Sequence, residues 1–345
     1  MRFREFSSTA RQIDAPKTRV KISALSGDHQ VPIVIEPASD GLDLADWAQS
    51  AKSLIDQHLY KAGAVLFRKF QITNVADFER VVRAISTTGE LMNYVENTSP
   101  RTTIRGNVKT STDHPADQEI VPHNEHSFSN VFPSKLFLCC RTTPLSGGET
   151  PLSDCRRITE RLPQEIRQRF RSKGGYLYVR NFGNGFGPDW PTVFQTRDRT
   201  LLERYLRAND IGFEWRPGDR LRIWYRRPTE VIHPVTRETV WFNHLLFWHI
   251  SSLETSVREV LLRSFSEWDL PNQSFYGDGS SIEPEMIELL RQIYQKETRQ
   301  TPWHINDVLV VDNVLLAHGR RAYTGKRLVL FAMADPWTRE QVNSN

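Results

Sequence analysis

Short apolar runs bounded by polar segments recur along the chain and predict a structure rich in β-strands. The run at 308–311 is Val-Leu-Val-Val, and the run at 64–67 is Ala-Val-Leu-Phe. Apolar runs of about four to eight residues with β-branched members are typical of buried strands. Further strands are predicted at residues 31–37, 240–244 and 328–331.

Other segments have the spacing of amphipathic helices. Between 43 and 61, apolar residues recur at intervals of three and four, which places them on one helical face. Similar patterns predict helices at 75–85, at 283–296, and at 158–171 with Pro163 in its first turns.

Many strands with a few helices packed outside indicate a mainly β fold. We expect a double-stranded β-helix, a jelly-roll architecture whose mouth can hold a metal ion. A chain of 345 residues with 39% hydrophobic residues can bury a large core. The expected organisation is a polar N-terminal arm at 1–20 and one domain at 21–345, with an insertion around 176–240 that borders the active site.

Composition excludes several function classes. The net charge of +4 is modest, and basic residues alternate with acidic ones, so nucleic acid is not an expected partner. The chain has neither a signal peptide's apolar segment nor an apolar run of about 18 residues, which predicts a cytoplasmic protein without a membrane partner. The three cysteines form no zinc pattern and no disulfide framework.

The chemistry is concentrated in His123, Glu125 and a distant His318. Two imidazoles and one carboxylate form the facial ligand set of mononuclear non-haem Fe(II) enzymes, which leaves positions open for O₂. Residues i and i+2 of a strand point to the same side, so His123 and Glu125 can reach one metal ion. A His-x-Glu pair alone is weak evidence, because such pairs arise by chance in a chain with ten histidines.

An oxygenase of this kind also needs 2-oxoglutarate, whose distal carboxylate requires a guanidinium and a hydroxyl in a dry pocket. Arg327 and Thr150 are the candidates. Arg327 begins an apolar strand, where an inward-facing arginine is costly unless it meets an anion. The alternative is that Arg327 faces solvent at the start of the strand.

These segments together resemble the taurine dioxygenase/TfdA family of Fe(II)- and 2-oxoglutarate-dependent oxygenases. The resemblance runs from about residue 30 to 337, and its motifs occur in the family's order. The glutamate ligand and the segment 110–117 are similar to the branch of clavaminate synthase-like and syringomycin-type amino-acid hydroxylases. The matching residues are His123-Asn124-Glu125, the segment 145–154, Asp312-Asn313, His318-Gly319-Arg320 and Arg327.

The resemblance implies that His123, Glu125 and His318 bind Fe(II), and that Thr150 and Arg327 bind 2-oxoglutarate. Taurine dioxygenase has a second arginine four residues after the first, which grips the substrate sulfonate. Here that position is Phe331, so a sulfonate substrate is not expected. Related halogenases replace the metal carboxylate with a small residue, so the retained glutamate disfavours halogenation.

The implied reaction is hydroxylation of an unactivated C–H bond in an amino acid or its derivative, free or bound to a carrier as a thioester, in specialised metabolism. O₂ is consumed. The predicted substrate contacts are Arg101, Asn243, and Arg320 or Arg321. A surface ion pair explains each arginine equally well. His126, His244 and His249 are expected as core or supporting histidines, and not as metal ligands.

Other functions remain open from the sequence. The same cofactors support desaturation, cyclisation or epimerisation. A cupin-type metal-binding isomerase and a non-catalytic binding protein are alternatives of another class, although a cupin usually supplies several histidines close together. A homo-oligomer is compatible with the sequence.

Overall fold

The computed structural model describes residues 19–24, 31–93, 96 and 101–343. Its largest sheet has eight strands in the order β1-β2-β3-β17-β7-β20-β5-β4, and only β2 and β3 are a parallel pair. The strands are β1 Val20–Ala24, β2 Ile33–Pro37, β3 Ala64–Phe67, β17 Val308–Asp312, β7 Val131–Thr142, β20 Leu328–Thr338, β5 Val108–Thr110 and β4 Thr103–Arg105.

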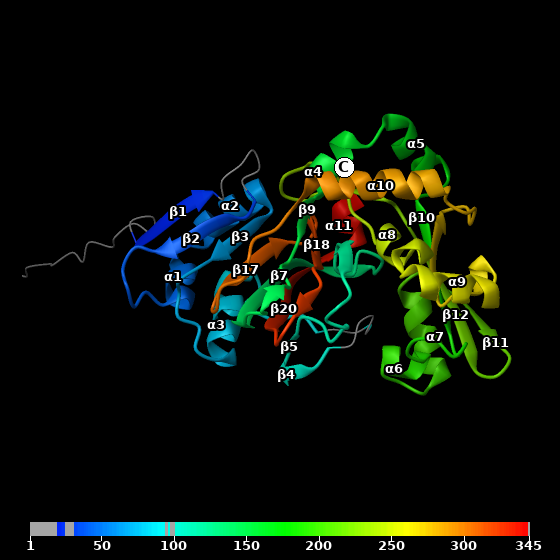
Figure 1. Cartoon of the computed structure of the whole chain (residues 1–345), viewed down its shortest axis with the longest axis horizontal. Helices are drawn as coiled ribbons and strands as arrows, with labels where there is room; N and C mark the ends of the chain where they lie inside the picture. Colours follow the sequence, from blue (N-terminus) through cyan, green and yellow to red (C-terminus); the bar gives the residue numbers. More distant parts are fainter. Residues whose placement is uncertain (1–18, 25–30, 94–95, 97–100, 344–345) are drawn as a thin grey trace, which may run out of the picture.

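The two faces of this sheet bury different cores, as the alternation of side chains along a strand requires. Val65 and Phe67 of β3 pack against three helices that cover the outer face (Figure 1). Leu66, between them, faces the main core of the molecule. The covering helices are α1 Leu44–Ser50, α2 Lys52–Ala62 and α3 Val75–Ile85.

A smaller sheet, in the order β16-β9-β18-β6, contributes to the same main core. Leu138 of the large sheet and Leu152 and Leu316 of the small one belong to one buried cluster. Two sheets around a shared core, with helices outside, confirm the predicted double-stranded β-helix. The small sheet consists of β16 Thr298–Arg299, β9 Leu152–Asp154, β18 Leu316–Arg320 and β6 Ile120–His123, and α4 Cys155–Arg161 and α10 Pro284–Glu297 pack beside β9.

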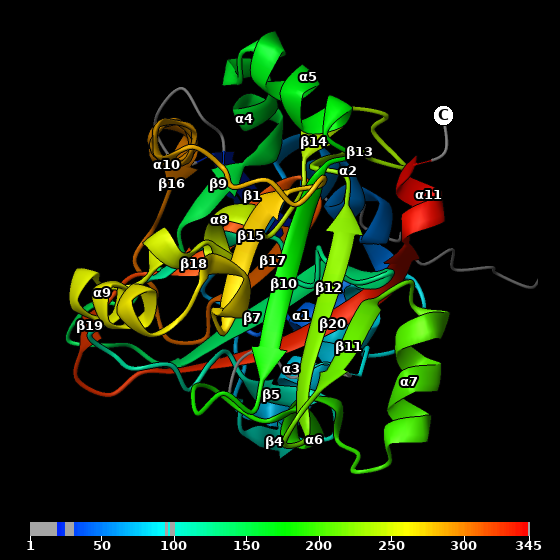
Figure 2. The same cartoon turned by 90° about the vertical axis from the view of Figure 1, so that its right-hand side faces the viewer.

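A third sheet, in the order β11-β12-β10-β15, faces the viewer in Figure 2. Tyr176, Tyr178 and Phe182 of β10 turn toward the main core, whereas Leu177 and Val179 form a separate small cluster with Phe275 of β15. The strands are β10 Tyr176–Phe182, β11 Gly212–Arg216, β12 Arg220–Arg227 and β15 Asn272–Tyr276.

Short hairpins and helices complete the chain. β13 and β14 form a hairpin, and the distant strands β8 and β19 form a second two-stranded antiparallel sheet. The remaining elements are β8 Ser146–Gly147, β13 Glu230–Ile232, β14 Thr239–Trp241, β19 Tyr323–Thr324, α5 Gln164–Ser172, α6 Trp190–Phe194, α7 Arg199–Ala208, α8 Leu245–Trp248, α9 Thr255–Ser264 and α11 Arg339–Asn343, with 3₁₀ turns at Ile250–Ser252 and Glu267–Asp269.

Two segments were each predicted as a single helix, and in the structure each contains two helices. The helix is interrupted at Ala51. The interruption lets α1 pack on α3, while α2 packs on β3 and β17. The segment 158–171 breaks at Leu162, because Pro163 has no N–H to continue the first helix and instead begins α5. The helix predicted at 75–85 is confirmed as α3, with a capping box between Asn74 and Asp77.

The predicted strand at 240–244 ends earlier, at Trp241. The next helix, α8, follows directly, with His244 at its N-cap, and the Asn243 side-chain oxygen accepts a hydrogen bond from the Leu245 N–H at 3.1 Å. The predicted N-terminal arm lies outside the described residues except for its last two positions. Within the described part of the chain, no helix is long and apolar enough to cross a bilayer.

Candidate metal centre

His123 and His318 meet because their strands are neighbours. His123 is the last residue of β6, and it lies directly opposite His318 of β18 in the antiparallel register. The centres of the two imidazole rings are 4.7 Å apart. The register therefore brings together two residues that are far apart in the sequence.

Glu125 completes this group from the turn that follows β6. Its Oε2 atom lies 3.7 Å from Nε2 of His123 and 3.6 Å from Nε2 of His318. The ligand atoms of all three residues lie within 4.8 Å of one another, as a shared metal ion requires. The prediction placed Glu125 on the strand itself, which was wrong, since the strand ends at His123.

Charge and burial prepare these side chains for a cation. Burial alone would raise the pKa of Glu125, but Arg101, 3.1 Å from its Oε2 atom, and the nearby histidines hold that pKa well below the usual range. Burial lowers the pKa of His318 to about 3, so its imidazole is neutral near pH 7. Nδ1 of His123 lies 2.9 Å from the Val121 carbonyl oxygen, which fixes its proton there and turns Nε2 toward the centre.

Asn313, in the turn between β17 and β18, fixes the backbone of this group. Its side chain accepts a hydrogen bond from the Glu125 N–H at 2.7 Å and donates one to the Glu125 carbonyl at 2.9 Å. The Asn124 amide donates in turn to the Asn313 carbonyl at 2.7 Å. One side chain thus joins the turn that carries Glu125 to the turn that leads to His318.

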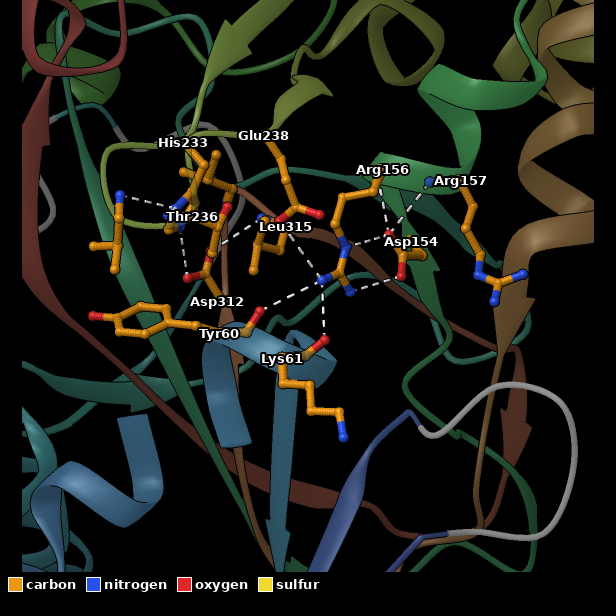
Figure 3. Close-up of polar contacts among 12 residues, drawn as sticks. Tyr60, Lys61, Asp154, Arg156, Arg157, His233, Thr236, Glu238, Asp312 and Leu315 are labelled. Carbon is orange, nitrogen blue, oxygen red and sulfur yellow. Dashed lines mark hydrogen bonds and ion pairs between the residues drawn. The ribbon is translucent and has the colours of Figure 1, made fainter. Parts of the chain in front are cut away.

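Asp312 and His233 stabilise the turn that leads to His318 (Figure 3). Oδ1 of Asp312 accepts hydrogen bonds from the Val314 and Leu315 N–H groups at 2.9 and 3.0 Å. Nε2 of His233 lies 3.1 Å from Oδ2 of Asp312. Because Nδ1 of His233 accepts a hydrogen bond from the Thr236 N–H at 3.0 Å, its proton sits on Nε2 and is donated to Asp312.

Arg327 and Thr150 line one cavity with His123 and His318. Arg327 donates to the Gly148 carbonyl at 2.9 Å and to the Ser111 hydroxyl at 3.1 Å, and no described carboxylate lies within ion-pair distance. Burial, together with the charge of Arg320, lowers its pKa to about 10. The Thr150 hydroxyl is buried and has no hydrogen-bond partner among the described residues.

Two glycines allow the close approaches at this site. A Cβ atom on Gly319 would lie 2.4 Å from the Ile120 carbonyl oxygen, so any side chain there would push β18 away from β6. Gly148 has φ +73°, and a Cβ atom there would lie 3.1 Å from the Arg327 Cδ atom and 2.8 Å from Pro144. Both positions therefore require glycine for steric reasons.

An apolar pocket of about 240 Å³ lies beside the metal group. Phe247 lines it, and the Phe247 ring centre is 4.5 Å from that of His123. Trp248 lines the pocket too, and stacks on Tyr178 at 5.0 Å. The pocket shares Thr112 and Ile120 with the cavity of Arg327, so the two spaces adjoin at the metal group.

The predicted substrate contacts lie in three different settings. Arg101 lines the cavity, and its guanidinium lies 4.0 Å from the centre of the Phe331 ring. Arg320 also lines the cavity, but its terminal nitrogens donate to backbone carbonyls, including those of His114 and Gln118. Asn243 donates to the Thr229 carbonyl at 3.0 Å in the core beside α8.

The three histidines that were expected as core or supporting residues each lie close to a serine hydroxyl. His244 lies 2.6 Å from the Ser127 hydroxyl, His249 lies 2.6 Å from the Ser251 hydroxyl, and His126 lies 3.3 Å from the Ser129 hydroxyl. Arg321 pairs with Glu119 at 3.2 Å. Burial raises the pKa of Cys140 to about 11, and Cys139, Cys140 and Cys155 are all free and buried.

Sequence reasoning gave no role to Asn313, Asp312 or His233. The Asp312-Asn313 pair was visible in the motif before His318, and side chains of this type commonly fix turns. His233 had no comparable signal, because its contact with Asp312 depends on the position of a distant hairpin.

The fold and the site define a class: the protein is an Fe(II)- and 2-oxoglutarate-dependent dioxygenase. The model of the family described as taurine catabolism dioxygenase TauD, TfdA family matches residues 24–333, and the chain belongs to that family. The expected cofactors are therefore confirmed as Fe(II), 2-oxoglutarate and O₂.

The chain is similar in sequence to two curated relatives and similar in fold to one solved structure. The dapdiamide synthesis protein DdaC of Enterobacter agglomerans is 37% identical over 82% of this chain and 85% of its own. A clavaminate synthase-like protein of Arabidopsis thaliana is 31% identical over 88% of this chain and 93% of its own. The crystal structure of PvcB from Pseudomonas aeruginosa matches the fold with a TM-score of 0.52 and 14% identity, over 94% of this chain and 93% of that one.

Proposed function

We propose that this dioxygenase hydroxylates an unactivated C–H bond of an amino acid or a close derivative. His123, Glu125 and His318 hold Fe(II), while Thr150 and Arg327 hold the distal carboxylate of 2-oxoglutarate. The observation that carries the proposal is the convergence of two Nε2 atoms and one carboxylate oxygen beside a cavity lined by Arg327 and Thr150.

The protein's own residues fit these cofactors. The buried Thr150 hydroxyl lacks a partner among the described residues, and the Arg327 guanidinium lacks a described carboxylate, so an incoming carboxylate satisfies both groups. When bound, the iron and 2-oxoglutarate use O₂ to hydroxylate the substrate, and 2-oxoglutarate becomes succinate and CO₂.

The residues of the chain position the metal ligands and keep water out of the pocket. Asn313 and the His123 hydrogen bond fix the ligand directions, and Phe247 and Trp248 give the adjoining pocket an apolar wall. An apolar wall keeps water away from reactive species and leaves the substrate as the nearest C–H donor. Arg101 and Arg320 stay predicted substrate contacts beside the metal group, and Asn243 stays a predicted contact that bonds to backbone in this structure.

The amino-acid substrate rests on the relatives as well as on the site. DdaC is named for dapdiamide synthesis, and the Arabidopsis protein for its likeness to clavaminate synthase, which supports a role in specialised metabolism. A free amino acid and a carrier-bound aminoacyl group both fit this level of description.

The test is anaerobic binding followed by turnover. Wild-type protein with Fe(II) and 2-oxoglutarate is expected to give a metal-to-ligand charge-transfer band, and to form succinate when O₂ is added. His318→Ala should lose both, and Arg327→Met should lose the band at 2-oxoglutarate concentrations that saturate the wild type. Arg321→Met is the control, since this arginine pairs with Glu119 near the surface. A wild-type protein without band or succinate would contradict the assignment.

A further inference from the structure

Arg101 and Glu125 form an ion pair inside the metal group itself. Nη2 of Arg101 lies 3.2 Å from Oε1 and 3.1 Å from Oε2 of Glu125. The exposed fractions of the two side chains are 6% and 4%, so solvent screens these charges only weakly. The same carboxylate has to serve the metal ion, because its Oε2 atom lies 3.6 Å from Nε2 of His318. One negative charge is therefore shared between two cations once a metal ion is bound.

The cavity beside the metal group supplies no second acid. Its lining includes Arg101, Arg320 and Arg327, and none of its described lining residues is an aspartate or a glutamate. The two positive charges of Fe(II), together with those of Arg101 and Arg327, exceed the negative charges of Glu125 and the 2-oxoglutarate dianion by one. A buried charge is costly unless an opposite charge compensates it. The loaded site therefore favours one further anion.

Among the three arginines, Arg101 is the one placed to bind this anion. Arg327 is assigned to the distal carboxylate of 2-oxoglutarate, and both terminal nitrogens of Arg320 donate to backbone carbonyls of residues 114–118. Arg101 meets Glu125 through Nη2, and its guanidinium lies 4.0 Å from the centre of the Phe331 ring. A guanidinium carries five N–H donors, which is enough for two carboxylates at once.

A second cation, Lys109, adds to the positive potential beside Arg101. Lys109 of β5 pairs directly with Phe331 of β20, so the two side chains lie on the same face of the sheet. Burial and the charge of Arg101 both lower the pKa of Lys109. A carboxylate bound at Arg101 would relieve this repulsion as well.

The apolar pocket beside the metal group gives room for the rest of the substrate. It shares Thr112 and Ile120 with the cavity that Arg101 lines. Its volume is about 240 Å³, and its wall includes Phe247, whose ring centre lies 4.5 Å from that of His123. A molecule with its carboxylate at Arg101 can therefore extend an apolar body past the metal group into this pocket.

We propose that Arg101 binds a free carboxylate of the substrate, and that metal binding prepares it to do so. The inference rests on the proposed function and narrows the substrate to an anion with an apolar body. Without metal, Glu125 compensates Arg101. With metal, Glu125 also serves the metal ion, and the substrate carboxylate takes over. An aminoacyl group held as a thioester fits only if its side chain carries the carboxylate.

The first test measures Zn(II) affinity, which requires neither substrate nor turnover. Arg101→Met removes a cation beside the metal ligands, so Zn(II) is expected to bind about 10-fold more tightly or better. Arg101→Lys, which keeps the charge, should stay near the wild type. An arginine that only positioned Glu125 would have the opposite effect, because its loss would weaken metal binding. Unchanged or weaker Zn(II) binding by Arg101→Met would overturn the inference.

The second test measures carboxylate recognition by the Zn(II) protein with 2-oxoglutarate, which does not turn over. The twenty L-amino acids and their N-acetyl forms are each compared with the corresponding primary amide by calorimetry. In the wild type, at least one acid should bind about 10-fold more tightly than its amide, and only with Zn(II) present. Arg101→Met should bind acid and amide equally.

The matched control for this second test is Arg320→Met. Arg320 lines the same cavity but donates to backbone carbonyls, so its variant should keep the preference for the acid. If no acid is preferred over its amide, or if Arg101→Met keeps the preference, the carboxylate site is refuted. If Arg101→Met weakens 2-oxoglutarate binding as strongly as Arg327→Met does, Arg101 serves the cosubstrate instead, and the inference is overturned.

The outcomes separate this inference from the proposed function. A charge-transfer band and succinate formation that depend on Arg327 support the proposed function, whichever residue holds the substrate. If both are present and no acid is preferred over its amide, the inference fails alone. If both are absent while Arg101 still selects the acid, the proposed function fails and the anion site stands.

Discussion

At the metal end of the site, Glu125 already faces Arg101 at 3.1 Å and Asn313 holds its peptide group on both sides. At the cosubstrate end, Arg327 is buried and meets neutral oxygens, with no described carboxylate in ion-pair distance. The charge of Glu125, at the metal end, is thus already paired with that of Arg101 before any metal binds. The cosubstrate end keeps a charge that its ligand must compensate.

This difference separates two ways to build a site. A compensated group is rigid and stabilises the fold, so its removal should damage both stability and binding. An uncompensated group costs stability and is useful only when its ligand is present, as expected for buried charges. Substitutions at the two ends should therefore change stability in opposite directions.

The largest effect is expected from Glu125→Ala. Succinate formation should fall to background, because a metal ligand is lost and the buried ion pair between Glu125 and Arg101 is broken. Breaking a buried pair costs about 3–5 kcal/mol, so the free energy of unfolding should fall by a similar amount. Chemical denaturation measures it, with Glu119→Ala, an exposed acid, as control. Unchanged stability would remove the contrast between the two ends.

Arg327→Met should behave in the opposite way. We expect the KM for 2-oxoglutarate to rise roughly 100-fold, since the lost contact is a buried charge pair worth about 2–5 kcal/mol. The Tm of the ligand-free protein should stay equal or rise, because burial of an uncompensated charge is relieved. Steady-state kinetics and thermal unfolding give the two quantities. A fall in Tm would place Arg327 with the structural arginines.

Asn313→Ala tests whether the two hydrogen bonds between the Asn313 side chain and the Glu125 backbone keep the metal end rigid. Its loss frees the Glu125 peptide, and groups that orient metal ligands typically contribute about 10–100-fold in metal affinity. Titration with Co(II), followed by its visible spectrum, measures the change. His233→Gln acts one step further away, through Asp312, and should weaken binding less than Asn313→Ala. The reverse order would contradict the proposed chain of contacts.

The last prediction concerns His249, which lines the apolar pocket, and has a small effect at each single pH unit. Burial, with the charges of Arg291 and Arg258, lowers the pKa of His249 to about 4. Between pH 6.5 and 4 the unfolded chain takes up a proton that the folded protein refuses, so stability falls as pH falls. The slope contributed by His249 is at most about 1.4 kcal/mol per pH unit. Denaturation of His249→Gln at several pH values should show a shallower slope, and an identical slope would exclude His249 as the cause.

The elements that could be predicted from the sequence are those set by local pattern. The strand at 64–67 and the helix at 75–85 have the predicted bounds, because each follows a clear local pattern of apolar residues. The helix breaks at Ala51 and Leu162 were missed, since the first depends on which neighbour each half packs against. The grouping of His123, Glu125 and His318 was predictable through motif order, because several distant motifs agreed.

The contacts that tune the site could not be predicted in the same way. Arg101 pairs with Glu125, whereas the Arg320 guanidinium donates to backbone carbonyls, and the residues next to each arginine in the sequence do not reveal either contact. Glu96 and Tyr225 lie in unrelated segments, yet the Tyr225 hydroxyl donates to the Glu96 carboxylate at 2.8 Å. Such arrangements follow from tertiary geometry, which a single sequence does not encode locally.

The close approach of Gly319 to the Ile120 carbonyl has a consequence for protein engineering. Because a Cβ atom there would collide with the Ile120 carbonyl, His318 and Gly319 behave as one inseparable unit in any library of variants. Directed evolution toward new substrates can vary the pocket wall at Leu253, whereas position 319 offers no productive alternatives. The molecule thus separates residues open to redesign from a two-residue segment that must be inherited intact.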